Sequence, residues 1–166
     1  MIPASPNKLY TFFLQAFFEA MSRLHFRSIN INAPKFSDNN NSLVLIANHM
    51  SWWDGFLAQK VNNKLFKRSF HVMMLEKELS KRRFLRKTGA FSISRGSRSA
   101  LASLEYAAEI LDSPSNMLLL FPQGRFQSSH RHPLDFEMGW YRIIEMAEST
   151  PQIVFMASLF DYFEHR

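Results

Sequence analysis

The chain has 166 residues, 46% of them hydrophobic and 20% charged, so we expect one globular domain with its own core. It contains no cysteine, which excludes disulfides, thiolate metal sites and a cysteine nucleophile. A net charge of +6 favours anionic partners, such as nucleic acid, anionic lipid headgroups or phosphorylated substrates.

The first expected element is an amphipathic helix over residues 8–27. Its apolar side chains recur near helical spacing, and further aromatic residues widen that face: Leu9, Phe12, Phe13, Leu14, Phe17, Phe18, Met21 and Leu24. Glu19, Arg23 and Arg27 interrupt the apolar run, so we do not expect it to cross a bilayer. No small-residue cleavage site follows, so the segment is not typical of a signal peptide.

The rest of the chain alternates between strand and helix patterns. After a short strand at 28–32 and a loop at 38–42, five apolar runs predict strands at 43–47, 70–75, 91–93, 117–121 and 152–160. Helices are expected at about 53–62, 77–87, 98–112 and 139–148. In the helix at 98–112, one face is expected to carry Leu101, Leu104, Ala108 and Leu111. This alternation predicts an α/β fold with a central mixed or mostly parallel sheet flanked by helices.

The strongest chemical signal is residues 48–54, which follow directly on the strand at 43–47. Neutral imidazole is the usual general base near pH 7, which makes His49 the leading candidate. Asp54, expected in the first turn of the next helix, can reach back to one ring nitrogen and fix the tautomer. Alternatively, Asn48 or Ser51 caps that helix and His49 has no chemical role.

A second candidate element runs from Gly89 through a short strand to Arg95. A guanidinium at a strand end can hold a phosphate group with two hydrogen bonds. Lys77, just past the strand at 70–75, is a second candidate cation. The alternative is a solvated arginine at a strand end that binds no ligand.

The third candidate element is Phe121-Pro122-Gln123-Gly124-Arg125, which ends the strand at 117–121. Proline stops the strand, and glycine allows backbone N–H groups to approach a ligand closely. Gln123 can hydrogen-bond a carbonyl or hydroxyl group, and Arg125 can pair with phosphate. If this strand end lies beside the one before His49, the two would form an active site. The alternative is an ordinary turn, here opening a loop of about seventeen residues.

Two further features of the sequence are weaker signals. His130 and His132 alternate on the expected loop without a matching carboxylate cluster, so no metal site is expected. The basic stretch at 81–87 fits a solvated helix face, a membrane contact or a nucleic-acid patch. Nucleic-acid binding rests on charge alone, because the Lys and Arg residues are scattered over several elements, and it is not expected.

Taken together, the three elements resemble the lysophospholipid acyltransferase superfamily, which includes the 1-acylglycerol-3-phosphate acyltransferases. Its blocks are Asn-His followed by Asp after four residues, a glycine-strand-arginine segment, and Phe-Pro-Glu-Gly-Thr-Arg. They are matched in order by Asn48, His49 and Asp54, by Gly89 through Arg95, and by Phe121, Pro122 and Gly124. A lysine-bearing segment is matched by residues 76–79, and the resemblance covers roughly residues 40–160. Three residues depart from the third block: Gln123 replaces Glu, Arg125 replaces Thr and Phe126 replaces Arg.

The resemblance implies a glycerolipid acyltransferase-like fold over residues 28–166 and a role in phospholipid biosynthesis. The implied activity transfers a fatty acyl group from acyl-CoA or acyl-carrier protein to a hydroxyl of a lysophospholipid or related amphiphilic acceptor. His49 would be the general base, oriented by Asp54, with no covalent intermediate, metal or prosthetic group. Substrate contacts are expected from Asn48, Lys77, Arg95, Phe121, Pro122, Gln123, Gly124 and Arg125.

The resemblance also places residues 1–27 in the membrane interface, as part of a peripheral or monotopic protein on the cytoplasmic face. A fourth block is matched only loosely by residues 151–157, and we expect the acyltransferase domain to be truncated at its C-terminus. The rival interpretation is a lipid-binding, membrane-associated protein that has lost catalysis, and Gln123 and the displaced arginine motivate it.

Overall fold

A computed structural model of the protein describes residues 1–37, 39–96, 99–128 and 133–161. Its centre is a five-stranded sheet in the order β3-β2-β4-β1-β5, with every neighbouring pair parallel. The strands are β1 (Leu43–Ala47), β2 (Ser69–Leu75), β3 (Ala90–Ile93), β4 (Asn116–Leu120) and β5 (Gln152–Met156). The sheet is thus entirely parallel, which confirms the expected α/β class.

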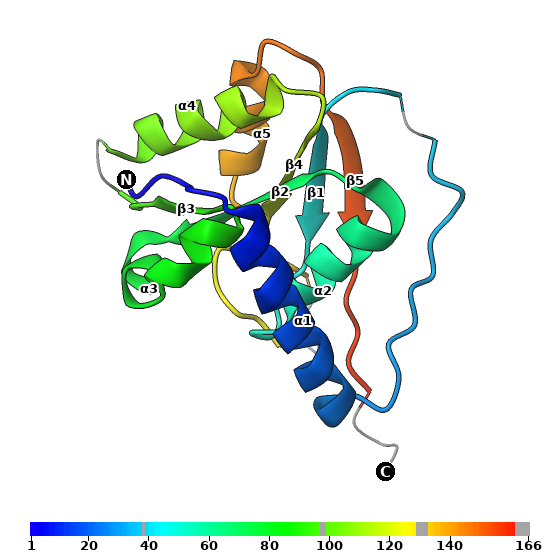
Figure 1. Ribbon diagram of the computed structural model, residues 1–166. Coiled ribbons are helices and arrows are strands. Elements are labelled where there is room, and N and C mark those ends of the chain that lie inside the picture. The colour runs from blue at the N-terminus through cyan, green and yellow to red at the C-terminus, as the bar shows by residue number, and fades with distance from the viewer. Residues whose placement is uncertain (38, 97–98, 129–132, 162–166) are drawn as a thin grey trace.

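Helices connect the strands and cover both faces of the sheet (Figure 1). They are α1 (Lys8–His25), α2 (Asp54–Val61), α3 (Glu76–Lys81), α4 (Ser99–Leu111) and α5 (Gly139–Met146). A π-helical turn extends α2 over Asn62–Phe66, and a 3-10 helix follows α3 over Arg83–Thr88. The basic helical stretch expected at 77–87 is therefore two short helices.

Strand β1 supplies side chains to the cores on both faces of the sheet. Leu43, Leu45 and Ala47 pack with α2 and α3, whereas Val44 and Ile46 pack with α4 and α5. All five residues are buried. A strand covered on both faces has no polar side, which is why its sequence is a continuous apolar run.

Three sequence-based expectations about these elements are wrong. Residues 28–32 form no strand, because this segment makes no ladder with the sheet. The last strand ends at Met156, so residues 157–160 are not part of it. Leu101 is 56% exposed, because the buried face of α4 also includes Ala107 and Ile110. That face is therefore rotated away from Leu101.

Helix α1 packs on the body of the protein with one side only. Phe18 stacks on Phe56 of α2 with ring centroids 3.4 Å apart, and Glu19 pairs with Lys60 at 2.6 Å. The hydrogen bond from Lys60 holds the pKa of the Glu19 carboxyl below its ordinary value. The opposite side exposes an apolar stripe formed by Leu9, Phe12, Phe13, Phe17 and Leu24.

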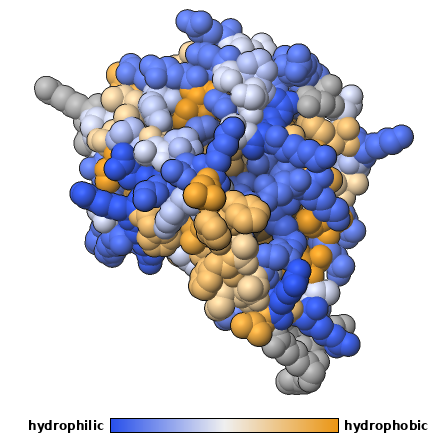
Figure 2. Space-filling model, in the orientation of Figure 1, coloured by the Kyte–Doolittle hydropathy of each residue, from blue (hydrophilic) through white to orange (hydrophobic). Residues whose placement is uncertain are grey.

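The apolar stripe appears in Figure 2 as an orange patch over α1. Each of its five side chains is more than half exposed. Among the described residues, no helix combines the length and the apolar character that a bilayer crossing requires.

Candidate active site

The sheet order brings the two most informative sequence segments together. Strands β1 and β4 are neighbours, with Ile46 opposite Leu120, so residues 48–54 and 121–125 leave the same edge of the sheet. Sites in parallel α/β sheets form at this carboxyl edge. The two strand ends thus lie side by side, which is the condition under which they were expected to form a site.

His49 and Asp54 are in direct contact at this edge. The ring Nδ1 of His49 lies 3.1 Å from Asp54 Oδ2. Asp54 is fully buried at the start of α2, and its Oδ2 also accepts hydrogen bonds from the backbone N–H groups of Met50 (2.7 Å) and Ser51 (2.8 Å). The carboxylate therefore has a fixed position. An Nδ1–H that donates to it leaves Nε2 as the unprotonated, basic nitrogen.

Two aromatic rings hold the imidazole in place. The ring of Phe121 stacks on His49 at 4.0 Å with an interplanar angle of 19°, and Phe126 lies at 4.2 Å with an angle of 38°. Phe126 occupies the position where the family pattern has arginine. Its contact with His49 was not foreseen, because sequence alone does not tell which way a loop side chain turns.

Gln123 and Gln127 hold the backbone of His49. Gln123 Oε1 accepts the His49 N–H at 2.5 Å, and its Nε2 donates to Gln127 Oε1 at 2.9 Å. The Gln127 N–H donates to the His49 carbonyl at 2.9 Å. Both glutamine side chains are at most 5% exposed. Both ends of the Gln123 amide are thus engaged with His49 and Gln127. Gln127 was missed because it lies outside the motif.

Asn48 is also tied to the protein. Its Nδ2 donates to the Ser158 carbonyl at 2.9 Å, and its Oδ1 accepts the Ser158 N–H at 2.7 Å. Asn48 thus fastens the end of β1 to the segment after β5 and does not cap α2. Ser51 Oγ accepts the Trp53 N–H at 3.0 Å in the turn before α2, but no side chain caps the first turn of that helix, so the capping alternative is wrong.

A cavity of about 550 Å³ lies beside His49, within the range usual for small-molecule sites. His49 is among the residues that line it. Its walls come from α1, α2, the sheet and the segment after β4, and most of them are apolar. They include Leu14, Phe18, Trp52, Phe56, Val72, Met74, Phe121 and Phe126.

The predicted cations lie in different places. Arg95 lines the cavity, donates from Nη2 to the Gly124 carbonyl at 2.7 Å and pairs with Glu137 at 3.1 Å. Arg125 also lines it, 3.8 Å from Asp135. Lys77 is exposed on α3 and is not among the lining residues.

Arg82, five residues beyond Lys77 and just past the end of α3, occupies the cavity wall instead. It pairs with Glu78 at 2.6 Å, and its guanidinium lies 4.7 Å from the centre of the Trp52 ring. The hydrogen bond from Arg82 holds the pKa of Glu78 below its ordinary value. Arg82 belongs to the basic stretch at 81–87, which by sequence fits a solvated helix face, a membrane contact or a nucleic-acid patch.

The turn after β4 uses its own backbone groups. Gly124 adopts φ +61°, and its N–H donates to the Phe121 carbonyl at 2.9 Å. This N–H is therefore engaged within the turn. A Cβ at position 124 would lie 1.4 Å from Arg95 Nη2, so glycine is required for the approach of that arginine.

Within the described part of the chain, no three metal-type side chains gather in one place. His130 and His132, weighed above as metal ligands, lie outside the described residues.

Comparison with known proteins identifies the family of the chain. The sequence model of the family named Acyltransferase matches residues 28–157, most of the chain. This chain belongs to the acyltransferase family. The matched residues of this acyltransferase include His49, Asp54, Arg95 and the turn after β4.

One relative of the acyltransferase is the 1-acyl-sn-glycerol-3-phosphate acyltransferase of Streptococcus pneumoniae (strain ATCC BAA-255 / R6). The two are 31% identical over 122 residues, which cover 70% of this chain and 42% of the relative. The chain thus spans less than half of that protein's length. The His49–Asp54 contact agrees with the histidine and aspartate of the family motif.

Proposed function

We propose that this acyltransferase moves a fatty acyl group from acyl-CoA or acyl-carrier protein to a hydroxyl of a lysophospholipid or related amphiphilic acceptor. The observation that carries the proposal is the contact between His49 Nδ1 and buried Asp54 beside an apolar cavity. That contact leaves Nε2 as the base. The cavity offers apolar surface to an acyl chain.

The proposed reaction needs only one base. His49 Nε2 takes the proton of the acceptor hydroxyl while the hydroxyl oxygen attacks the thioester carbonyl carbon. The carbon–sulfur bond then breaks, and the leaving thiolate takes the proton back from the imidazolium. Asp54 stays ionised and stabilises the positive ring between these two steps.

We place the acyltransferase domain at residues 28–166 and assign residues 1–27 to the membrane interface. The exposed apolar stripe of α1 supports this placement, because aromatic side chains on an amphipathic helix suit the headgroup boundary. The inner side of α1 lines the cavity through Leu14 and Phe18. A helix in the interface would thus bring the cavity next to the acceptor's membrane, with peripheral or monotopic attachment on the cytoplasmic face, where we expect the thioester donors.

The test is release of free thiol from long-chain acyl-CoA and acyl-carrier protein, with and without lysophospholipid acceptors. We expect acceptor-dependent release that falls by about 10²- to 10⁴-fold in His49→Ala, the usual contribution of a general base. His71→Ala is the matched control, because His71 lies on β2 and is not among the residues that line the cavity. Circular dichroism checks that the His49→Ala fold is retained.

Two results would count against the proposal. Full turnover in His49→Ala would remove this residue from the mechanism. Release from neither donor with any acceptor, in a protein that still binds lipid, would favour the rival function of a lipid-binding protein without catalysis.

A further inference from the structure

The cations that line the cavity are all paired with carboxylates. This holds for every Lys and Arg among the described lining residues. The pairs are Lys60–Glu19 at 2.6 Å, Arg82–Glu78 at 2.6 Å, Arg95–Glu137 at 3.1 Å and Arg125–Asp135 at 3.8 Å. Although the chain carries a net charge of +6, its cavity therefore presents charge pairs and not a positive surface.

The Arg95–Glu137 pair is built into the turn that follows β4. Arg95 reaches the Gly124 carbonyl across a position where any Cβ would collide with it. The Glu137 N–H donates to the Pro122 carbonyl at 2.9 Å. Both residues thus contact the segment that also supplies Phe121, which stacks on His49. A ligand beside His49 meets a cation and an anion together.

This pair is open to exchange with a ligand. The side chains of Arg95 and Glu137 are 41% and 57% exposed, and exposed ion pairs contribute little net stability. Both contacts that the described residues make with Arg95 use Nη2. Its Nη1 and Nε carry further N–H groups that make no contact with the described residues, and each can donate to a phosphate oxygen.

We propose that Arg95 and Glu137 form a subsite for a zwitterionic acceptor headgroup, a phosphodiester that carries an ammonium group. The proposal rests on the acyl transfer proposed above and names its acceptor class. The phosphodiester, with one negative charge, lies on Arg95, and the ammonium group lies on Glu137. A phosphate monoester carries about −1.5 to −2 charges at pH 7, and its second charge would face the Glu137 carboxylate.

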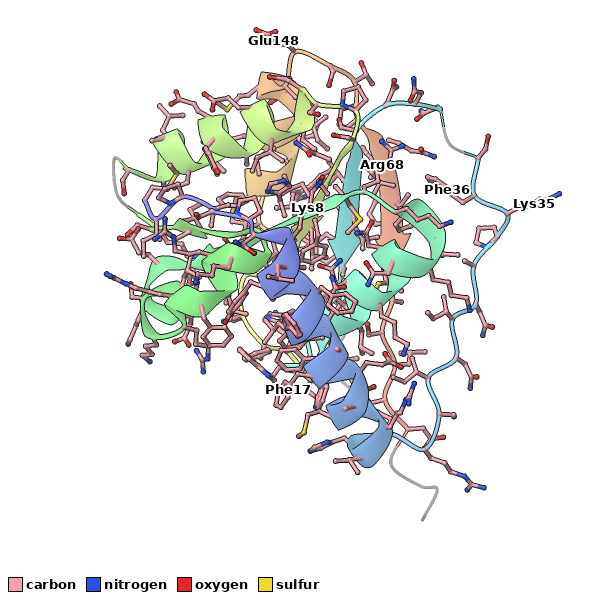
Figure 3. The ribbon with its side chains drawn as sticks, in the orientation of Figure 1. Lys8, Phe17, Lys35, Phe36, Arg68 and Glu148 are labelled. Carbon is pink, nitrogen blue, oxygen red and sulfur yellow. The ribbon has the colours of Figure 1, made fainter. Side chains whose placement is uncertain are left out.

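The experiment compares two lysolipids with the same acyl chain, lysophosphatidylethanolamine and lysophosphatidic acid. For each, kcat/KM is measured in the wild type, Glu137→Gln and Glu148→Gln. We expect the wild type to prefer the zwitterion and Glu137→Gln to shift the ratio about tenfold toward the monoester, as loss of one nearby charge predicts. Glu148→Gln, which makes the same charge change at the opposite end of the molecule from Phe17 on α1 (Figure 3), should leave the ratio unchanged.

A binding measurement separates this inference from the catalytic proposal. Both lysolipids are titrated below their critical micelle concentrations into His49→Ala and into His49→Ala/Glu137→Gln. The same shift in the ratio of dissociation constants is expected. An unchanged ratio in both assays, or a wild-type preference for the monoester, overturns the subsite and leaves acyl transfer standing. A shift in binding without transfer to either lysolipid overturns the catalytic proposal and retains the subsite.

Discussion

Gln123 stands where the family pattern has glutamate, and its contact with Gln127 can accommodate either residue. Gln123 uses its oxygen on the His49 N–H and its nitrogen on Gln127 Oε1. Gln127 Nε2 is buried and has no hydrogen-bond partner among the described residues. If the Gln127 amide rotates by half a turn, it offers this nitrogen in place of its oxygen. Position 123 can then accept either an amide or a carboxylate.

This arrangement predicts coupling between positions 123 and 127. Gln123→Glu alone should keep kcat/KM within a few-fold of wild type, because Gln127 can turn to donate to the new carboxylate. In a Gln127→Leu background, the same substitution leaves a buried carboxylate oxygen without a donor, which typically costs more than about 1–3 kcal/mol. We expect a coupling free energy of at least about 1 kcal/mol in a double-mutant cycle on unfolding.

The cycle compares wild type, both single variants and the double variant by urea denaturation, with thiol release as a second readout. Gln127→Leu in the wild-type background is the internal control, since it strands only a neutral amide of Gln123. Free energies that add within about 0.5 kcal/mol would show that the two side chains act independently.

For single residues, the sequence predicts those that belong to a motif. It misses those that reach the site only through the folding of a loop. His49 and Asp54 were singled out because a histidine at a strand end, with a carboxylate five residues on, can form a base-and-orienter pair, and the two side chains do meet. Glu137 was missed, since it meets Arg95 only after a loop has folded back across the turn. Lys77 was named as a cation because it lies just past the strand at 70–75, and only the course of α3 shows that Arg82 lines the cavity in its place.

Helix α1 shows the corresponding limit for a whole element. Its helical spacing was read correctly, and its bounds differ from the expected 8–27 by two residues at one end. Sequence alone could not tell which apolar residues pack, because Phe residues surround much of the helix. The structure buries the side that carries Phe18 and Ser22 and leaves the apolar stripe uncovered.

The uncovered stripe predicts membrane binding that depends on α1. Burying a phenylalanine side chain contributes about 1.5–3 kcal/mol, so replacing three of them should weaken vesicle binding by about 10²-fold or more. The variant is Phe12→Ser/Phe13→Ser/Phe17→Ser, and the measurement is co-sedimentation with phospholipid vesicles. These residues are 56–64% exposed, so the fold should survive.

Leu101→Ser provides a comparison for this variant. Leu101 is 56% exposed on α4, and α4 covers the sheet face opposite to the one on which Leu14 of α1 packs. Its replacement should leave vesicle binding unchanged. Equal losses in both variants would mean that general surface hydrophobicity, and not α1, governs the association.

Over the whole molecule, the net positive charge lies outside the cavity. The lining cations are paired with carboxylates. Lys8, Arg23 and Arg27 are exposed on or just after α1, and Arg23 lies 3.7 Å from Glu19. The basic 3-10 helix packs beside the start of α1, where the N–H groups of Ser5 and Asn7 bond to the carbonyls of Arg86 and Lys87. Part of the positive charge thus lies close to the apolar stripe, which favours an anionic membrane surface.

This distribution predicts two separable contributions to membrane binding. Each Lys or Arg near an anionic surface contributes about 1 kcal/mol, and raising salt from about 0.01 M to 1 M shortens the screening length from about 30 Å to 3 Å. Binding to anionic vesicles should therefore weaken about 10²-fold over this range, if three such residues act. Binding to zwitterionic vesicles rests on the stripe, so it should change less than about twofold.

The Phe12→Ser/Phe13→Ser/Phe17→Ser protein separates the charge contribution from the apolar one. It keeps the basic residues, so it should retain the salt dependence on anionic vesicles while losing affinity for zwitterionic ones. Salt dependence that disappears together with the phenylalanines would mean that the basic residues do not reach the surface by themselves. Equal salt effects on the two kinds of vesicle would show that charge and apolar contact do not act separately, contrary to the placement of the positive charge beside the stripe.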